Sequence, residues 1–333
     1  MLRLHSYAYD RPTSLEEALR IIAANPGAAM PIAGGTDLMP NMKHQLFTPK
    51  RLVALRQIPE LHGIRVANGE LVIGAAETLT AISRHPLVLQ HAPSLARAAG
   101  LVAGPQLRNM GTIGGNLCLD TRCTYYNQTY FWREALGFCL KKDGEVCHVT
   151  KVGKKCVAAH SADTPPVLMT LGASVDLASA EGQRSLAVAD FYVADGIENT
   201  LRGWNELVTR VRVPLPTAGT RAAYVKLRQR ASIDFPLLSI AVAGDFEGDV
   251  VRDLRIVVTA LGARPRQLNG LEKIAAGQRL TAEVVDAVTE RAFAQCHPLE
   301  NIIVDPEWRR AMVPVYVRRA LVELGGASSE AAA

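Results

Sequence analysis

Four of the six cysteines in this 333-residue chain lie within residues 123–156. They are Cys123, Cys139, Cys147 and Cys156, and the residues between them are mostly glycine, lysine and polar side chains rather than an apolar core run. Four thiolates on loops that fold back on one another form a tetrahedral metal cage, as in iron–sulfur clusters and structural zinc sites. This segment is therefore predicted to fold around a metal group.

The spacing C-x15-C-x7-C-x8-C leaves four interpretations open. The segment can hold a [4Fe–4S] cluster, a [2Fe–2S] cluster or zinc, or it can be a loop with incidental thiols. Structural zinc sites usually contain close C-x2-4-C pairs, and none occurs here. The wide spacing therefore favours a cluster held by an extended loop. Cys118 and Cys296 lie outside the group, and both are predicted to be small buried apolar residues.

Charged and aromatic residues accompany these cysteines. A cluster with four thiolates is anionic, so nearby ammonium groups favour its reduced form. The alternative is a solvated loop surface. The aromatic residues either shield the metal group or form the small core of the loop itself. The residues concerned are Lys141, Lys142, Lys151, Lys154 and Lys155, and the pairs Tyr125-Tyr126 and Phe131-Trp132.

Two glycine-rich segments suggest a phosphate-binding role. The first is Gly34-Gly35-Thr36-Asp37, which follows a short apolar run, and the second is Gly111-Thr112-Ile113-Gly114-Gly115-Asn116. Consecutive glycines beside a threonine can direct several backbone N–H groups at one anion. Neither segment fits the G-x-G-x-x-G pattern, which disfavours a Rossmann NAD site. Together they predict a cradle for the two phosphates of one dinucleotide.

The composition argues against a nucleic-acid-binding protein and against a membrane protein. The net charge of +5 is spread along the chain without a basic block, so we do not expect nucleic-acid binding. Hydrophobic residues make up 48% and charged residues 21%, as in soluble globular proteins. The sequence shows neither a leader-type apolar segment nor an 18-residue apolar run. We expect a cytoplasmic protein without a membrane partner or a disulfide framework.

Three consecutive units are predicted along the chain. Residues 1–57 combine a helix that begins after Ser14 with short strands. Residues 58–216 open with a hairpin turn at Asn68-Gly69 and include the cysteine segment, at about 119–160. Residues 217–333 show three strands followed by helices. Strands and helices in separate runs predict an α+β fold.

These motifs together resemble the FAD-binding medium subunits of the xanthine oxidase family of molybdenum enzymes, over nearly the full chain. The matching segments are P-I-A-G-G-T-D-L at 31–38, G-T-I-G-G-N at 111–116, S-A-D-T-P at 161–165, and K-L-R-Q-R-A-S-I-D-F-P-L-L-S-I at 226–240. About 40 residues between the second and third segments carry the cysteines. This insertion resembles that of the β subunit of 4-hydroxybenzoyl-CoA reductase, which holds a [4Fe–4S] cluster.

The resemblance implies a two-part FAD-binding region of the PCMH type, with subdomains 1–57 and 58–216. A C-terminal domain, 217–333, would contain a three-stranded antiparallel sheet with a helical bundle. Cys123, Cys139, Cys147 and Cys156 would ligate the cluster. The implied FAD contacts are Pro31, Ile32, Ala33, Gly34, Gly35, Thr36, Asp37, Leu38, Gly111, Thr112, Ile113, Gly114, Gly115, Asn116, Asp163, Leu207 and Lys226. Asp163 would bind the sugar portion of FAD, and Leu207 and Lys226 would lie near its rings.

The resemblance also implies an electron-transfer subunit of an oxidoreductase, with no catalytic residue on this chain. Its partners would be a large subunit with the molybdenum cofactor and a small subunit with two [2Fe–2S] clusters, assembled as a dimer of heterotrimers. The implied reaction is reduction of 4-hydroxybenzoyl-CoA to benzoyl-CoA in aromatic degradation, with ferredoxin as the donor. The alternatives are a related enzyme for another aromatic or heteroaromatic substrate, in either direction, and a zinc-stabilised non-catalytic module.

Overall fold

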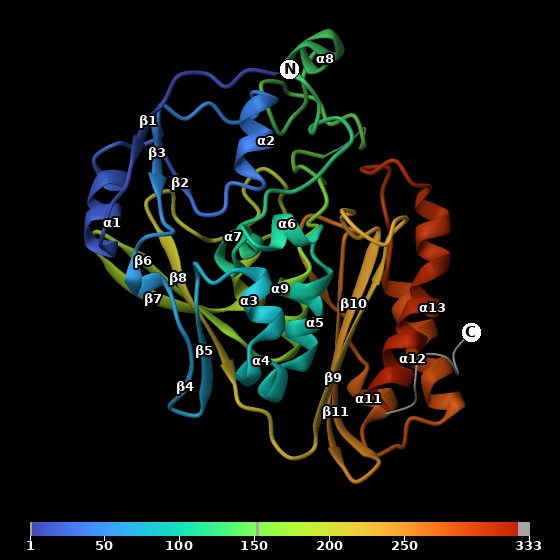
Figure 1. The fold of residues 1–333 in the computed structure, drawn as a ribbon. Coiled ribbons are helices and arrows are strands. Elements are labelled where there is room, and N and C mark those ends of the chain that lie inside the picture. The colour runs from blue at the N-terminus through green and yellow to red at the C-terminus, as the bar shows by residue number, and fades with distance from the viewer. Residues whose placement is uncertain (1, 151–152, 326–333) are drawn as a thin grey trace.

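The computed structural model describes residues 2–150 and 153–325 and contains three β-sheets with helices between and beside them (Figure 1). The sheets follow one another along the chain, and most helices occupy separate runs, so the α+β prediction is confirmed. The predicted unit boundaries at 57/58 and 216/217 fall between the sheets and stay a prediction. Residues 326–333, which complete the third predicted unit, and Lys151 lie outside the described residues.

The first sheet is parallel, with the strand order β1-β3-β2. The Ser14 hydroxyl starts helix α1 by accepting a hydrogen bond from Glu17 N at 3.2 Å. The helix buries Ala18 and Ile22 in a core that also contains Val53. The elements of this unit are β1 (Ala8–Asp10), α1 (Leu15–Ala23), β2 (Ala29–Ile32), α2 (Leu38–Lys43) and β3 (Arg51–Ala54), and the 3-10 turn η1 (Pro59–Leu61) opens the next unit.

The second sheet has five antiparallel strands in the order β4-β5-β8-β6-β7. Its first hairpin turns at Asn68 and Gly69, with φ values of 53° and 77°, as the sequence predicted. The strands are β4 (Ile64–Ala67), β5 (Glu70–Gly74), β6 (Ser174–Ser179), β7 (Gly182–Ala187) and β8 (Leu207–Pro214). The cysteine segment lies in the sequence between the first hairpin and β6. It is therefore an insertion within this unit.

Helices fill the space between the second and third sheets (Figure 1). Their apolar side chains, such as Leu95 and Val167, share one core with Val211 of β8 and Val257 of the third sheet. The helices of this unit are α3 (Leu79–Arg84), α4 (Pro86–His91), α5 (Pro93–Leu101), α6 (Pro105–Arg108), α7 (Ile113–Leu117), α9 (Thr164–Thr170) and α10 (Val188–Phe191). Helix α8 (Tyr130–Leu136) belongs to the cysteine segment.

The third sheet contains the three predicted antiparallel strands, β9 (Thr220–Leu227), β10 (Leu238–Glu247) and β11 (Val250–Thr259). A two-residue strand, β12 (Arg266–Gln267), extends it at one edge. Its far face packs against α11 (Glu272–Ala275), α12 (Ala282–Gln295) and α13 (Pro306–Leu324) (Figure 1).

None of the helices in residues 2–150 and 153–325 combines the length and apolar character that crossing a bilayer requires.

Candidate cofactor site

A cavity of about 490 Å³ opens where the first unit, α7 and the start of the cysteine segment meet. This volume is within the usual range for cofactor pockets. Both glycine-rich segments line the cavity. The lining residues that the sequence singled out are Pro31, Ile32, Ala33, Gly34, Gly35, Thr36, Asp37, Leu38, Gly111, Thr112, Gly114, Gly115, Asn116, Asp163 and Leu207. The structure therefore brings together residues from four separate parts of the sequence.

The two glycine-rich segments touch each other. A Cβ atom added to Gly34 would lie 1.9 Å from Met110 O, directly before the second segment, so only glycine fits at this position. Gly35 has a φ of +68°, in the left-handed region that favours glycine. The close contact keeps the two segments side by side at the wall of the cavity.

The two segments differ in the backbone donors that they offer. In the described part of the chain, the N–H groups of Gly34, Gly35 and Thr36 have no acceptor. In contrast, Ile113 N and Gly114 N donate to Glu77 O and Ala75 O, at 3.0 and 2.9 Å. Thr112 N of the second segment has no acceptor among the described residues, and Thr112 lines the cavity. That both segments hold the phosphates therefore stays a prediction. Three adjacent N–H groups without acceptors make the first segment suited to bind an anion.

The second segment also has a packing role. Thr112 caps α7 by accepting a hydrogen bond from Gly115 N at 3.1 Å. A Cβ on Gly114 would lie 2.9 Å from the Ala75 backbone oxygen, so the helix can approach β5 closely only with glycine there. This geometry turns Ile113 into the core, where it is fully buried. Ile113 does not line the cavity, and its predicted contact with the cofactor stays a prediction.

Asp163 lies on the cavity wall at the start of α9, and its contact with the sugar portion of FAD stays a prediction. Its Oδ1 accepts a hydrogen bond from the Tyr224 hydroxyl at 2.5 Å and lies 2.9 Å from Lys226 Nζ. Burial raises the pKa of Asp163, and Lys226 opposes this effect. Lys226 itself does not line the cavity. Its ion pair with Asp163 fixes the orientation of that carboxylate, and its predicted place near the cofactor rings stays a prediction.

Several cavity residues were not found from the sequence. Arg122, Arg202 and Phe235 line the cavity, and the Arg122 guanidinium stacks on the Phe235 ring with its carbon 4.3 Å from the ring centroid. Cys118 also opens into the cavity, so its prediction as a buried residue was wrong. Cys296 is buried as predicted. No local pattern marks the missed residues, although Phe235 lies within the fourth matching motif.

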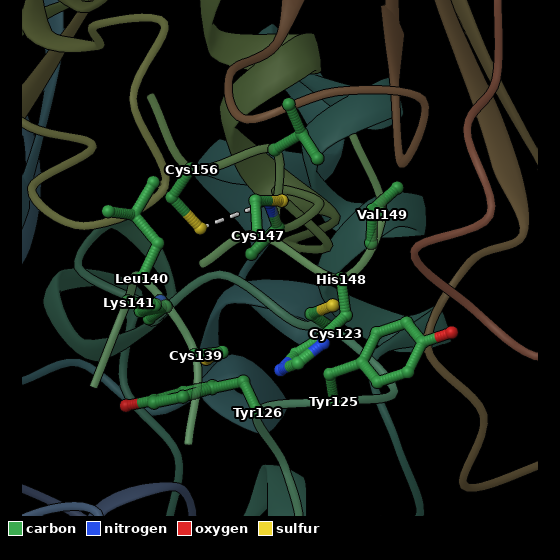
Figure 2. Close-up of a pocket in the computed structure, with 12 residues that line it drawn as sticks. Cys123, Tyr125, Tyr126, Cys139, Leu140, Lys141, Cys147, His148, Val149 and Cys156 are labelled. Atoms are coloured by element: carbon green, nitrogen blue, oxygen red, sulfur yellow. Dashed lines mark hydrogen bonds between the residues drawn. The ribbon is translucent and has the colours of Figure 1, made fainter. Parts of the chain in front are cut away.

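A second, smaller cavity is lined by all four clustered cysteines (Figure 2). Cys139 and Cys156 are buried, and Cys123 and Cys147 are half-buried. Ala158 N donates a hydrogen bond to Cys156 Sγ at 3.4 Å. Burial raises the pKa of the Cys123 thiol to about 11 and also raises the pKa of Cys156. A thiol must lose its proton to bind a metal, so metal binding here releases protons.

The arrangement of the thiols differs from a single-ion site. Within residues 2–150 and 153–325, no three His, Cys, Asp or Glu side chains lie close enough together to hold one metal ion. All four cysteines instead line one small cavity (Figure 2). The donor set is the one that an iron–sulfur cluster uses, and the cluster stays a proposal.

The residues around the thiols separate into an inner and an outer group. Tyr126 is buried in a small cluster with Leu46 and Cys139, whereas 79% of the Phe131 surface is exposed. Only Tyr126 of these two can therefore exclude water from the thiols. His148 lines the cavity, and its Nε2 lies 2.6 Å from Phe138 O, which leaves that nitrogen engaged.

Two family models match the chain in sequence. One, described as the FAD binding domain in molybdopterin dehydrogenase, covers residues 5–216. The other, described as the CO dehydrogenase flavoprotein C-terminal domain, covers residues 222–324. Together they span the cavity and all three sheets. The FAD prediction is thereby confirmed. The large cavity, which both glycine-rich segments line and which is called the flavin cavity below, would suit FAD, and its individual contacts stay a prediction.

Individual relatives agree with these models. The chain is 29% identical over 316 residues to the carbon monoxide dehydrogenase medium chain of Hydrogenophaga pseudoflava, covering 95% of this chain and 96% of that one. It is 32% identical over 306 residues to the aldehyde oxidoreductase FAD-binding subunit PaoB of Escherichia coli (strain K12), covering 89% and 92%. The structure of carbon monoxide dehydrogenase from H. pseudoflava, lacking the Mo-pyranopterin moiety, superimposes with a TM-score of 0.80 at 29% identity, over 97% and 99% of the two chains. The chain is an oxidoreductase subunit and belongs to the FAD-binding medium subunits of the xanthine oxidase family of molybdenum enzymes.

Proposed function

We propose that this chain is an electron-transfer subunit that carries a [4Fe–4S] cluster in addition to FAD. The observation that supports this most is the convergence of Cys123, Cys139, Cys147 and Cys156 on one cavity. FAD exchanges electrons singly or in pairs, so it can connect a one-electron carrier to a two-electron reaction. A thiol-held cluster next to the flavin cavity would supply such a carrier.

The residues of the chain have distinct parts in this function. The free N–H groups of Gly34, Gly35 and Thr36 would bind the FAD diphosphate. Asp163, held by Lys226 and Tyr224, would accept hydrogen bonds from the sugar portion. The four cysteines would ligate the cluster, with the buried Tyr126 limiting access of water.

We further propose that the holoenzyme is 4-hydroxybenzoyl-CoA reductase. The support is the likeness of the cysteine segment to the insertion of its β subunit. The partners would be a large subunit with the molybdenum cofactor and a small subunit with two [2Fe–2S] clusters, in a cytoplasmic dimer of heterotrimers. Ferredoxin would be the electron donor.

A second candidate is the same subunit in an enzyme for another aromatic or heteroaromatic substrate. Relatives named for carbon monoxide, aldehydes, nicotinate and nicotine match nearly the full chain. A common subunit thus accompanies different reactions, and this chain is proposed to hold no substrate-binding residue. The sequence of the large partner subunit and a reduction assay with 4-hydroxybenzoyl-CoA separate the two candidates.

Quantification of iron, sulfide, zinc and flavin in one anaerobically purified sample of the full chain tests the proposal. We expect about four irons, four sulfides and one FAD per chain. FAD without iron or sulfide would refute the cluster and keep the family. Zinc without flavin would instead support a zinc-stabilised, non-catalytic module.

A further inference from the structure

The flavin cavity and the cysteine cavity share a wall. Asp120 and Arg122 line the flavin cavity, and the next residue, Cys123, lines the cysteine cavity. Lys141 lines the cysteine cavity from a later part of the loop. The wall between the two sites is therefore one residue layer thick at this point, and its side chains are charged.

Lys141 crosses this wall. Its Nζ lies 2.6 Å from Asp120 Oδ1 and 3.2 Å from Thr121 O, and only 4% of its side chain is exposed. The ammonium also lies 4.3 Å from the centroid of the Tyr126 ring. One ion pair thus joins a residue of the cysteine cavity to a residue of the flavin cavity.

Lys141 differs from the other described lysines of the segment. Lys142 is 36% exposed and lies 3.4 Å from the exposed Asp143, and Lys154 and Lys155 are exposed to solvent. Water screens such charges strongly, whereas a charge in a buried pair acts over a longer distance. Of these four lysines, Lys141 is the one placed to influence both cavities.

The charge of Asp120 also acts beyond the ion pair. Its Oδ2 is buried and has no hydrogen-bond partner in the described part of the chain. Asp37, another residue of the flavin cavity, responds to the same charges. Burial raises the pKa of Asp37, Arg122 and Lys141 oppose this effect, and Asp120 adds to it. Charges on the two sides of the wall therefore interact.

We propose that the Lys141–Asp120 ion pair sets the reduction potentials of the groups held on both sides of the wall. Lys141 and Asp120 are positioning residues here, since neither is proposed to bind an electron carrier directly. The cysteine-side half of this inference rests on the proposed cluster, and the flavin-side half rests only on FAD binding. A positive charge favours the electron-rich, reduced form of a nearby carrier, and a negative charge disfavours it.

The two members of the pair should therefore have opposite effects. Lys141→Gln removes the positive charge and keeps a hydrogen-bond donor, and we expect more negative reduction potentials. Asp120→Asn removes the negative charge and keeps an acceptor, and we expect more positive potentials. At a fixed potential, the ratio of oxidised to reduced flavin should change on the order of tenfold in each variant.

The test is an anaerobic redox titration of the FAD-loaded full chain, followed by flavin absorbance and, for iron, by electron paramagnetic resonance. Lys142→Gln is the matched control and should leave both potentials unchanged. The double variant Lys141→Gln/Asp120→Asn carries no buried charge at this position, and its potentials should return towards the wild-type values. If one of the single variants does not fold, the other single variant and the double variant still test the proposal.

Opposite shifts with recovery in the double variant support the proposal. Shifts of the same sign, or none in the flavin, overturn it, because a merely structural role does not reverse sign with charge. If the wild-type chain contains no iron, the proposed cluster fails while the flavin titration still decides this inference. The two failures are thus distinguishable.

Discussion

Lys226 Nζ lies 2.9 Å from Asp163 Oδ1, and the two side chains are 1% and 3% exposed. Lys226 comes from β9 of the C-terminal sheet, and Asp163 stands at the start of α9 on the wall of the flavin cavity. Burial lowers the pKa of Lys226 and raises the pKa of Asp163, and each partner opposes the effect on the other. The pair therefore fastens the C-terminal sheet to the flavin cavity.

Replacing Lys226 with Met should destabilise the chain by about 3–5 kcal/mol, because it leaves the Asp163 carboxylate buried without its cation. Urea unfolding followed by circular dichroism measures the change. Arg252→Met is the control, since Arg252 and its partner Glu247 are 62% and 69% exposed. The control should change the free energy of unfolding by less than about 1 kcal/mol. Equal effects of both substitutions would contradict the assigned role of the pair.

The sequence predicted those parts of the site where only one type of amino acid can serve at a given position. Glycine is required where Gly34 meets the backbone of Met110, and cysteine is required for a thiolate cage, so both patterns are visible without a structure. The order of strands and helices was likewise visible, because alternating and helical apolar patterns persist over whole elements.

The remaining contacts depend on tertiary packing. Lys226 and Asp163 are 63 positions apart, and no local pattern shows that the two side chains form an ion pair. Arg122 was not predicted because its neighbours Asp37 and Phe235 come from distant segments. The core position of Ile113 within a binding motif follows from the cap at Thr112, which sets the rotation of α7.

Gly34→Ala should remove most of the bound FAD. The added methyl group would lie 1.9 Å from Met110 O and 2.4 Å from its carbonyl carbon, so the two glycine-rich segments must separate. The ratio of flavin absorbance to protein measures the loss. Gly262→Ala is the control, because nothing lies within 4 Å of its added Cβ. Full flavin content in Gly34→Ala would show that the contact between the segments is dispensable.

Cys139→Ser should lose most of the iron and sulfide and retain FAD. Cys139 is buried in the cysteine cavity and does not line the flavin cavity, so its loss should affect only the metal group. Cys296→Ala replaces a cysteine buried in the C-terminal core and should keep both cofactors. Iron, sulfide and flavin assays on the three proteins measure this. Equal iron in Cys139→Ser and the wild type would exclude Cys139 as a ligand.

The stability of the chain should fall in acid partly because of His160. This side chain is fully buried, its Nδ1 lies 2.9 Å from Thr259 Oγ1, and its Nε2 has no partner among the described residues. Burial lowers the pKa of His160 to about 3, from an ordinary value of 6.5. Between these values the unfolded chain binds a proton that the folded chain does not, so stability is full above about pH 6.5 and declines as the pH falls towards 3.

The decline from one such group is at most about 1.4 kcal/mol for each pH unit. Urea midpoints at several pH values between 7.5 and 4.5 measure it in the wild type and in His160→Gln, which keeps a polar group but cannot take up the proton. We expect a smaller decline in the variant. His297→Gln, which replaces an exposed histidine, is the control. If the wild type and His160→Gln lose stability in parallel, protonation of His160 is not a cause of acid unfolding, because only the wild type carries the buried imidazole.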